Sequence, residues 1–291
     1  MTIQQTIEKG VYVAALTPLR SNLRCHDAVL AKHCLNLLER GCQGVVVFGT
    51  TGEGASFSVK EKIKTIRSII ARGVNPRKLI VGNGAACLQD TIDLTVATTK
   101  LGCLASLICP PCFYKQVTEE GIIAFYREVI QRVDDPRLKI LLYHIPQLSG
   151  VPITVPILKK LSDEFPNNVI GIKESEGNMS LIQAILQAIP HTQLFVGKEM
   201  LLPQALACGG SGTICGIGNL WPELVRTLYE KGECPELSRR VEAIGQYPFV
   251  PFCKALMDKN QYRNWNQVRP PLSPLSTHES ETIKKYLSQI S

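Results

Sequence analysis

The sequence lacks the features that mark several classes of protein. No apolar run in its 291 residues approaches the ~20 residues that span a membrane. Residues 1–6 carry neither a basic cluster nor an apolar stretch, so we expect no signal peptide and a cytoplasmic location. Long basic runs are absent despite a net charge of +7, which argues against nucleic acid. That charge suits an anionic small substrate equally well, and an ordinary solvated surface is the simplest explanation of it.

Metal and redox signatures are missing as well. Histidine, aspartate and glutamate do not occur at the spacing of a metal site, so we expect no metal. Without a signal peptide, the eleven cysteines should be reduced thiols, mostly small core residues. Cys109 and Cys112 form a C-x-x-C, but no second pair lies at zinc spacing and two prolines separate them. The C-x-x-C motif is therefore only weak evidence for a redox or metal-binding role.

What the sequence does contain is an alternation of apolar, strand-like runs with amphipathic, helix-like segments. The clearest helix covers 58–72, where Ser58 and Glu61 form a capping box ahead of a stripe of isoleucines. Thr118, Thr154 and Pro222 mark further helix starts. The strand-like runs cover 11–16, 44–48, 78–81, 104–109, 139–143, 169–172, 193–196 and 212–215.

Eight strands alternating with helices predict an α/β fold, a (β/α)8 TIM barrel with a C-terminal helical appendage. The alternative is an open doubly wound sheet, which usually has a glycine fingerprint after its first strand. Here Thr17-Pro18-Leu19 follows that strand. We expect the barrel over residues 1–222 and a helical extension over 223–291, packed on it as one structural unit.

Lys173 is the most informative residue, because it ends the apolar run 169–172. A lysine at the end of a buried strand is costly unless it has a partner or a chemical role. Burial lowers the pKa of an ammonium group, and the unprotonated amine can attack a ketone to form a Schiff base. The alternative is a lysine that reaches solvent at the barrel mouth or pairs with a carboxylate.

Other chemical groups follow the remaining strands, whose carboxyl ends carry the active site of an α/β barrel. The glycine-rich turn 49–54 offers two threonine hydroxyls and free N–H groups, which suit a carboxylate. Tyr114 follows strand four and Tyr143 ends strand five. With Lys173, these groups could condense a 2-oxo acid and transfer protons. A protonated imine is itself an electron sink, so we expect no cofactor.

These segments resemble the dihydrodipicolinate synthase / N-acetylneuraminate lyase family of pyruvate-dependent class I aldolases. The resemblance covers essentially the whole chain. It implies a TIM barrel that makes or breaks a carbon–carbon bond between pyruvate and an aldehyde, and a homotetramer built as a dimer of dimers. The matching segments are 49–53, 143–146, 149–150, 171–178, 197, 209–219 and 269–272.

The resemblance also implies roles for single residues in catalysis. Lys173 would form the imine with pyruvate, and Tyr143 would be the general acid and base. Thr50 would link Tyr143 to Tyr114, which in this family often reaches across a subunit interface into a neighbouring active site. The alternative for Tyr114 is an interface packing residue.

Further residues would bind the substrate. Thr51 would hold the pyruvate carboxylate together with backbone N–H groups such as that of Gly52. Ile214 occupies the place of a residue that lines the pyruvate pocket, although a plain core residue is an alternative. Gly197 and Glu199 would lie in the substrate site. Glu199 would bind a hydroxyl, or else serve as an acid at a helix N-terminus.

Two departures from the family pattern bear on the substrate. True dihydrodipicolinate synthases carry an arginine two residues after Pro146, where this chain has Leu148. A leucine cannot grip the carboxylate of aspartate semialdehyde. Sialic acid lyases usually have two consecutive acids where this chain has Glu199 and Met200. A shorter 2-oxo-3-deoxy sugar acid therefore fits best, with the synthase as first alternative and N-acetylneuraminate lyase behind it.

Two more hypotheses follow from the same residues. Lys198 and the turn 211–213 suggest a phosphorylated substrate, because barrels often bind phosphate near strands seven and eight. The alternative to an enzyme is a non-catalytic protein that binds pyruvate as a sensor. It is disfavoured because the lysine, the tyrosine and both threonines of the expected site are all retained.

Overall fold

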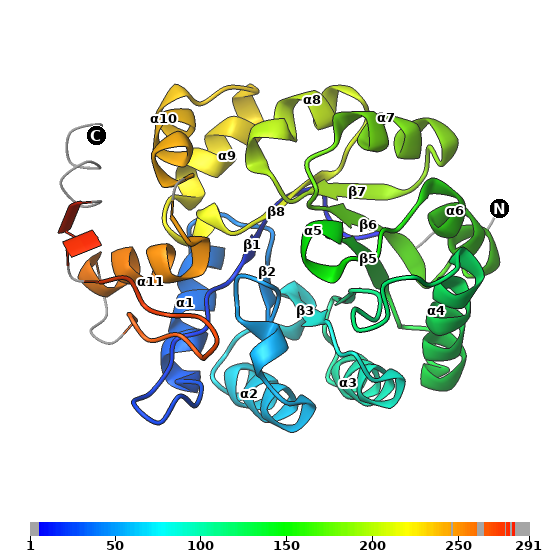
Figure 1. The fold of residues 1–291 in the computed structure, drawn as a ribbon, viewed down its shortest axis with the longest axis horizontal. Coiled ribbons are helices and arrows are strands. Elements are labelled where there is room, and N and C mark those ends of the chain that lie inside the picture. Colours follow the sequence, from blue (N-terminus) through cyan, green and yellow to red (C-terminus); the bar gives the residue numbers. More distant parts are fainter. Residues whose placement is uncertain (1–5, 246, 261–264, 277, 280, 283–291) are drawn as a thin grey trace.

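The computed structural model describes residues 6–282 except 246, 261–264, 277 and 280. Eight parallel strands form a closed barrel, in which each strand pairs with the next and β8 closes on β1 (Figure 1). The predicted TIM barrel is therefore confirmed. The strands are β1 (Gly10–Ala14), β2 (Gly44–Val47), β3 (Leu79–Asn83), β4 (Ala105–Ile108), β5 (Ile140–His144), β6 (Val169–Glu174), β7 (Gln193–Val196) and β8 (Gly212–Cys215).

Helices surround the barrel and begin where the sequence predicted. Ser58 makes both hydrogen bonds of the capping box with Glu61, and the side chains of Thr118 and Thr154 cap their helices. The helices are α1 (Asp27–Glu39), α2 (Val59–Ala71), α3 (Leu88–Lys100), α4 (Glu119–Val133), α5 (Pro146–Ser149), α6 (Val155–Glu164), α7 (Met179–Ala188), α8 (Leu202–Ala207), α9 (Pro222–Lys231), α10 (Pro235–Ile244) and α11 (Phe249–Asn260). Short 3₁₀ turns are η1 (Gly54–Ser56), η2 (Pro76–Lys78), η3 (Glu199–Leu201) and η4 (Ile217–Asn219).

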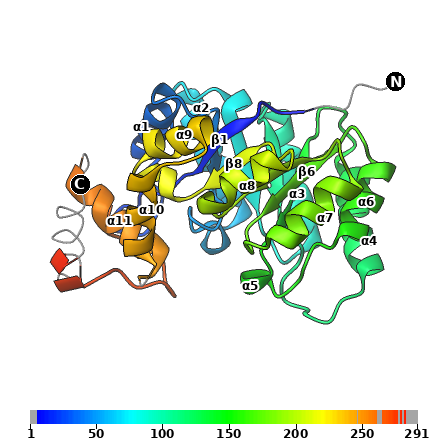
Figure 2. The ribbon, with the colours of Figure 1, turned by 90° about the horizontal axis from the view of Figure 1, so that it is seen from above.

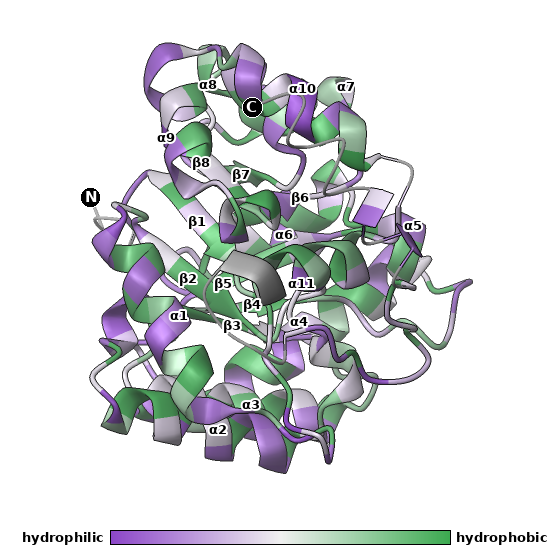
Figure 3. Ribbon diagram, turned by 90° about the vertical axis from the view of Figure 1, so that its left-hand side faces the viewer, coloured by the Kyte–Doolittle hydropathy of each residue, from purple (hydrophilic) through white to green (hydrophobic). Residues whose placement is uncertain are grey.

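Every strand is buried on both faces, which explains the continuous apolar runs of the sequence. One core fills the barrel interior and includes Leu141, Tyr143, Phe195 and Ile214. A larger core lies between the strands and the helices. Figure 3 shows apolar residues along the strands and polar residues on the outer helices. Because side chains alternate along a strand, Tyr143 faces the interior and its neighbour His144 faces the helix layer.

Beyond Pro222 the described residues form helices and loops only. Helices α9, α10 and α11 gather on the side of the barrel that carries β8 and α1 (Figures 1 and 2). Helix α9 stops at Gly232, whose φ of 76° lies in the left-handed region, and α10 begins at Pro235. No helix among the described residues is long and apolar enough to cross a membrane. Part of the predicted extension, residues 283–291, lies outside the described residues.

Candidate active site

Lys173 and Tyr143 meet inside the carboxyl end of the barrel. The β5–β6 register places them side by side. Lys173 Nζ donates to the Tyr143 hydroxyl at 3.4 Å and lies 4.6 Å from the centre of its ring. Lys173 is only 6% exposed, and the ion pairs of the described residues do not include it. This geometry excludes both alternatives for Lys173, namely a lysine that reaches solvent and a lysine that pairs with a carboxylate. Lys173 is a buried amine beside a hydroxyl group.

The turn after β2 places both threonines at the same opening. The Gly49 carbonyl accepts hydrogen bonds from the N–H groups of Gly52, at 3.1 Å, and Gly54, at 3.0 Å. A Cβ at Gly54 would lie 1.8 Å from the Phe48 carbonyl oxygen, so this close turn requires glycine there. The turn thereby brings Thr50 Oγ1 to 3.2 Å from the Tyr143 hydroxyl.

Thr51 lies in the same turn, facing the segment that follows β8. A Cβ added at Gly216 would meet Thr51 Oγ1 at 2.9 Å and the ring of Phe249 at 2.4 Å. Thr51, Gly216 and Phe249 are therefore neighbours at the barrel mouth. Sequence reasoning missed Phe249, because it belongs to α11 and lies far along the chain from the strand ends.

Further predicted site residues come from β7 and β8 and from the loop after β7. Ile214 is fully buried in the interior core, as expected for either of its two predicted roles. A Cβ at Gly197 would lie 2.0 Å from Ser175 Oγ, so the loops after β6 and β7 touch there. Glu199 is partly buried and opens η3. Burial raises its pKa, while its attraction to Lys173 opposes that rise. Glu199 therefore lies within electrostatic reach of Lys173.

Tyr114 stands apart from these residues within the single chain. Its side chain is 72% exposed and packs edge-on against Phe113, with ring centres 5.3 Å apart. The described part of the chain shows no hydrogen bond between Tyr114 and Thr50. The predicted link from Thr50 to Tyr114 is therefore not made inside one copy of this chain.

Comparison with known proteins assigns the family. The sequence model of the Dihydrodipicolinate synthetase family matches residues 8–290. This chain belongs to that family. It is 32% identical to an uncharacterized DapA-like lyase of Chloroflexus aurantiacus, with 97% of each chain covered. It is 28% identical to 4-hydroxy-tetrahydrodipicolinate synthase of Methanopyrus kandleri, over 97% of this chain and 96% of that protein.

The solved structures agree with this assignment. Dihydrodipicolinate synthase from Agrobacterium tumefaciens str. C58 superposes with a TM-score of 0.92 at 27% identity, covering 97% of this chain and 99% of that chain. The resemblance stated from the sequence is therefore confirmed. As a member of the dihydrodipicolinate synthetase family, the chain is a pyruvate-dependent carbon–carbon lyase.

A cavity of about 360 Å³ opens beside Thr50 and Tyr143 in this family member. The wall of the cavity is mainly apolar. One of the residues that line it is Leu148, whose side chain is 63% exposed. The described residues that line the cavity include no lysine or arginine. Three wall residues come from the C-terminal part of the chain, which the sequence did not predict to reach the site: Val250, Pro271 and Leu272.

The two cysteines of the C-x-x-C motif also line this cavity. Both are partly buried and free. Burial raises the pKa of Cys109 to about 12. A thiol with so high a pKa is a poor nucleophile and a poor metal ligand at neutral pH. The motif therefore forms part of the cavity wall, in keeping with the weak prediction from its sequence.

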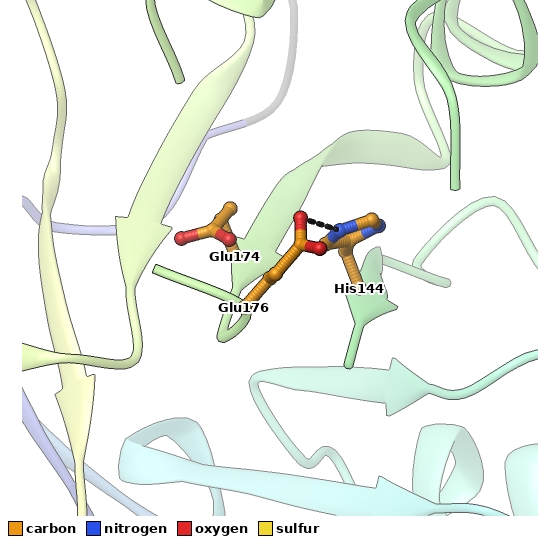
Figure 4. A group of neighbouring side chains, drawn as sticks. All are labelled: His144, Glu174 and Glu176. Atoms are coloured by element: carbon orange, nitrogen blue, oxygen red, sulfur yellow. Dashed lines mark hydrogen bonds and ion pairs between the residues drawn. The ribbon is translucent and has the colours of Figure 1, made fainter. Parts of the chain in front are cut away.

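A cluster on the outer face of β5 and β6 offers ligand atoms for a cation. His144, Glu174 and Glu176 each place one such atom within 4.8 Å of the others (Figure 4). The Ile153 N–H donates to His144 Nδ1 at 3.0 Å, which assigns the ring proton to Nε2. Nε2 faces Glu176 Oε2 at 3.3 Å. A metal would need the Nε2 lone pair, so this tautomer suits a hydrogen bond to carboxylate instead.

The structure corrects the prediction of a phosphate site shared by Lys198 and the turn 211–213. Lys198 follows the carboxyl end of β7, whereas Ser211 precedes the amino end of β8. The Ser211 N–H donates to the Leu194 carbonyl, in the second residue of β7, at 2.8 Å. Because the strands are parallel, Ser211 lies toward the opposite end of the barrel from Lys198. The two cannot bind one phosphate group.

Proposed function

We propose that this chain is a class I aldolase that joins pyruvate to an aldehyde, or separates them, through an imine on Lys173. The observation that carries the proposal is a buried lysine that lies 3.4 Å from a tyrosine hydroxyl and has no ion-pair partner among the described residues. The amine attacks C2 of pyruvate, and the resulting carbinolamine loses water to give the imine. Loss of a proton from the pyruvate methyl group gives an enamine, whose carbon then bonds to the aldehyde.

Tyr143 is placed to move the protons of these steps. Its hydroxyl lies beside the Lys173 amine and accepts or donates a hydrogen bond with Thr50 at 3.2 Å. It can protonate the departing hydroxyl of the carbinolamine and later protonate the alkoxide that forms from the aldehyde. Thr51 holds the pyruvate carboxylate through its hydroxyl and its N–H. The predicted help from the Gly52 N–H is not available, because that group donates to the Gly49 carbonyl at 3.1 Å. The imine accepts the electron pair in this scheme, so it requires no further cofactor.

The aldehyde partner is proposed to carry hydroxyl groups and no second carboxylate, as in a 2-oxo-3-deoxy sugar acid. Leu148 stands where a carboxylate-binding arginine would be needed, and the described residues of the cavity wall include no cation to replace it. Glu199 offers a carboxyl group to a substrate hydroxyl near Lys173. The second candidate is a 4-hydroxy-tetrahydrodipicolinate synthase, which is the name of the Methanopyrus kandleri relative.

A substrate panel separates these two candidates. Pyruvate release would be followed with lactate dehydrogenase and NADH on 2-oxo-3-deoxygluconate, its phosphate, N-acetylneuraminate and 4-hydroxy-2-oxoglutarate. We expect release from the unphosphorylated 2-oxo-3-deoxy acid, and no detectable condensation of pyruvate with aspartate semialdehyde. Silence across the panel together with rapid condensation would make the synthase the correct assignment.

Tyr114 is proposed to act in the active site of a neighbouring copy, within a homotetramer built as a dimer of dimers. Tyr114 and Phe113 are the most exposed large apolar side chains of the described residues, at 72% and 77%. Such a pair on one loop suits burial against another chain. Its hydroxyl would then reach Thr50 of that chain and extend the proton path from Tyr143.

Mixed subunits test this arrangement. Tyr114→Ala and Lys173→Ala should each be inactive or nearly so alone. When the two are unfolded together and refolded, mixed dimers contain one site with an intact Lys173 and the partner's Tyr114. We expect activity to return in the mixture. Activity that stays at the level of the separate variants would contradict a role across the interface.

A further inference from the structure

The buried Glu53 carboxylate joins the threonine-bearing turn to the C-terminal part of the chain. Its Oε1 accepts a hydrogen bond from Lys254 Nζ, and both side chains are completely shielded from solvent. Its Oε2 accepts from the Arg269 N–H at 2.6 Å. Lys254 also donates to the Gln267 carbonyl at 2.7 Å. A buried charge is tolerated only when it is met in this way, so Glu53 depends on the C-terminal segment.

The Arg269 side chain fastens the same segment to three parts of the barrel. Its guanidinium donates to the Leu23 carbonyl at 2.9 Å and to the Ser56 carbonyl. It pairs with Glu61 at 2.6 Å and lies 3.7 Å from the centre of the Phe57 ring. The hydrogen bond from Arg269 lowers the pKa of Glu61 to about 2. These contacts with the barrel fix the position of Arg269 and of the segment around it.

Movement of Glu53 would be transmitted directly to Thr50. The Glu53 N–H donates to the Thr50 carbonyl at 3.0 Å. Glu53 has a φ of 55°, which a non-glycine residue adopts at a cost unless its surroundings hold it there. The contacts of its carboxylate provide that restraint. The backbone that orients the two threonines is thus held from outside the turn.

The two segments that bind the Glu53 carboxylate, which contain Lys254 and Arg269, also carry residues of the barrel mouth. Phe249, beside Thr51, and Val250, in the cavity wall, lie in α11 with Lys254. Leu272, also in the cavity wall, lies three residues after Arg269. The ion pair between Glu53 and Lys254 therefore aligns the turn that would hold pyruvate with the cavity wall formed by the C-terminal part of the chain.

We propose that Glu53, Lys254 and Arg269 form a tether that sets the position of Thr50 and Thr51 over the imine-forming lysine. The proposal rests on the function proposed above. The three are positioning residues, because they act through the turn and not on the reacting atoms. Helix α11 and the segment around Arg269 therefore help to position the pyruvate site and do not only cover the barrel.

The test measures the pyruvate concentration at which borohydride traps half of Lys173. Three variants are compared with the unaltered chain: Lys254→Met, the double variant Glu53→Gln with Lys254→Met, and Leu158→Ala. Leu158 is a fully buried residue of α6 outside the tether, so its variant controls for lost stability. Both tether variants should raise the half-trapping concentration ~10-fold or more, because small displacements of binding groups are costly. The extent of trapping at saturating pyruvate should be unchanged.

Thermal unfolding of the same proteins separates position from stability. Lys254→Met leaves the Glu53 carboxylate buried without its partner, so it should lower Tm the most. The double variant removes that charge and should regain stability, yet its half-trapping concentration should stay raised. Leu158→Ala should lower Tm with wild-type trapping. Folded tether variants that trap at the wild-type concentration would overturn the tether. An unaltered chain that fails to trap would instead contradict the imine itself.

Discussion

Lys173→Ala is expected to reduce turnover of the best panel substrate to the background of the assay, a loss of roughly 10⁴-fold or more. Covalent catalysis ends when the nucleophile is removed, and effects of this size are usual for such residues. The variant should still fold, because alanine relieves the burial of an amine that is 6% exposed and that pairs with no carboxylate in the part of the chain that the structure describes. Initial rates of pyruvate release measure the effect.

The control for this experiment is Lys62→Met. Lys62 is also a buried lysine, 3% exposed, and burial lowers its pKa to about 8. It lies in α2, away from the carboxyl ends of β5 and β6. Lys62→Met should therefore keep wild-type turnover. Retention of measurable turnover by Lys173→Ala, with both variants folded, would remove the imine from the mechanism.

Tyr143→Phe is expected to lower kcat by ~10²–10⁴-fold, the range for loss of a general acid–base group. The ring would still pack in the barrel interior, but the hydroxyl beside Lys173 and Thr50 would be gone. Pyruvate binding through Thr51 should survive, so imine trapping at long times should still reach completion. Steady-state kinetics and the rate of trapping check the two parts of this expectation.

Tyr126→Phe is the matched control. Tyr126 is fully buried in α4, and its hydroxyl donates to the Ile108 carbonyl at 3.0 Å. Loss of that hydroxyl removes a buried hydrogen bond without touching the site, so it should lower stability and leave kcat unchanged. If Tyr143→Phe behaved like Tyr126→Phe, its hydroxyl would have no part in proton transfer.

The architecture could be predicted because its signals are local. Ser58 and Glu61 lie three residues apart, and their capping box marks the start of α2 whatever the rest of the chain does. The strands stand out because burial on both faces leaves a run of apolar residues. Lys173 was informative for the same reason, since a lysine that ends such a run is unusual.

The parts that escaped prediction depend on contacts between distant residues. Glu53 and Lys254 are 201 residues apart, and no local pattern shows that they pair. Val250 and Leu272 reach the cavity only because that pair and Arg269 hold the C-terminal segment there. The wrong prediction that Ser211 and Lys198 share a phosphate site has a different cause. A residue that precedes a parallel strand lies at its amino end, so the sequence already contained the information to place it away from Lys198.

Borohydride reduction traps an imine between pyruvate and Lys173 and so reveals the proposed intermediate itself. The unaltered chain and Lys173→Ala would each be treated with pyruvate and borohydride, digested and analysed by mass spectrometry. We expect a reduced pyruvate adduct on the peptide that contains Lys173, and none in the variant. If a folded, unaltered chain yields no adduct, or yields one on another lysine, Lys173 does not form the catalytic imine.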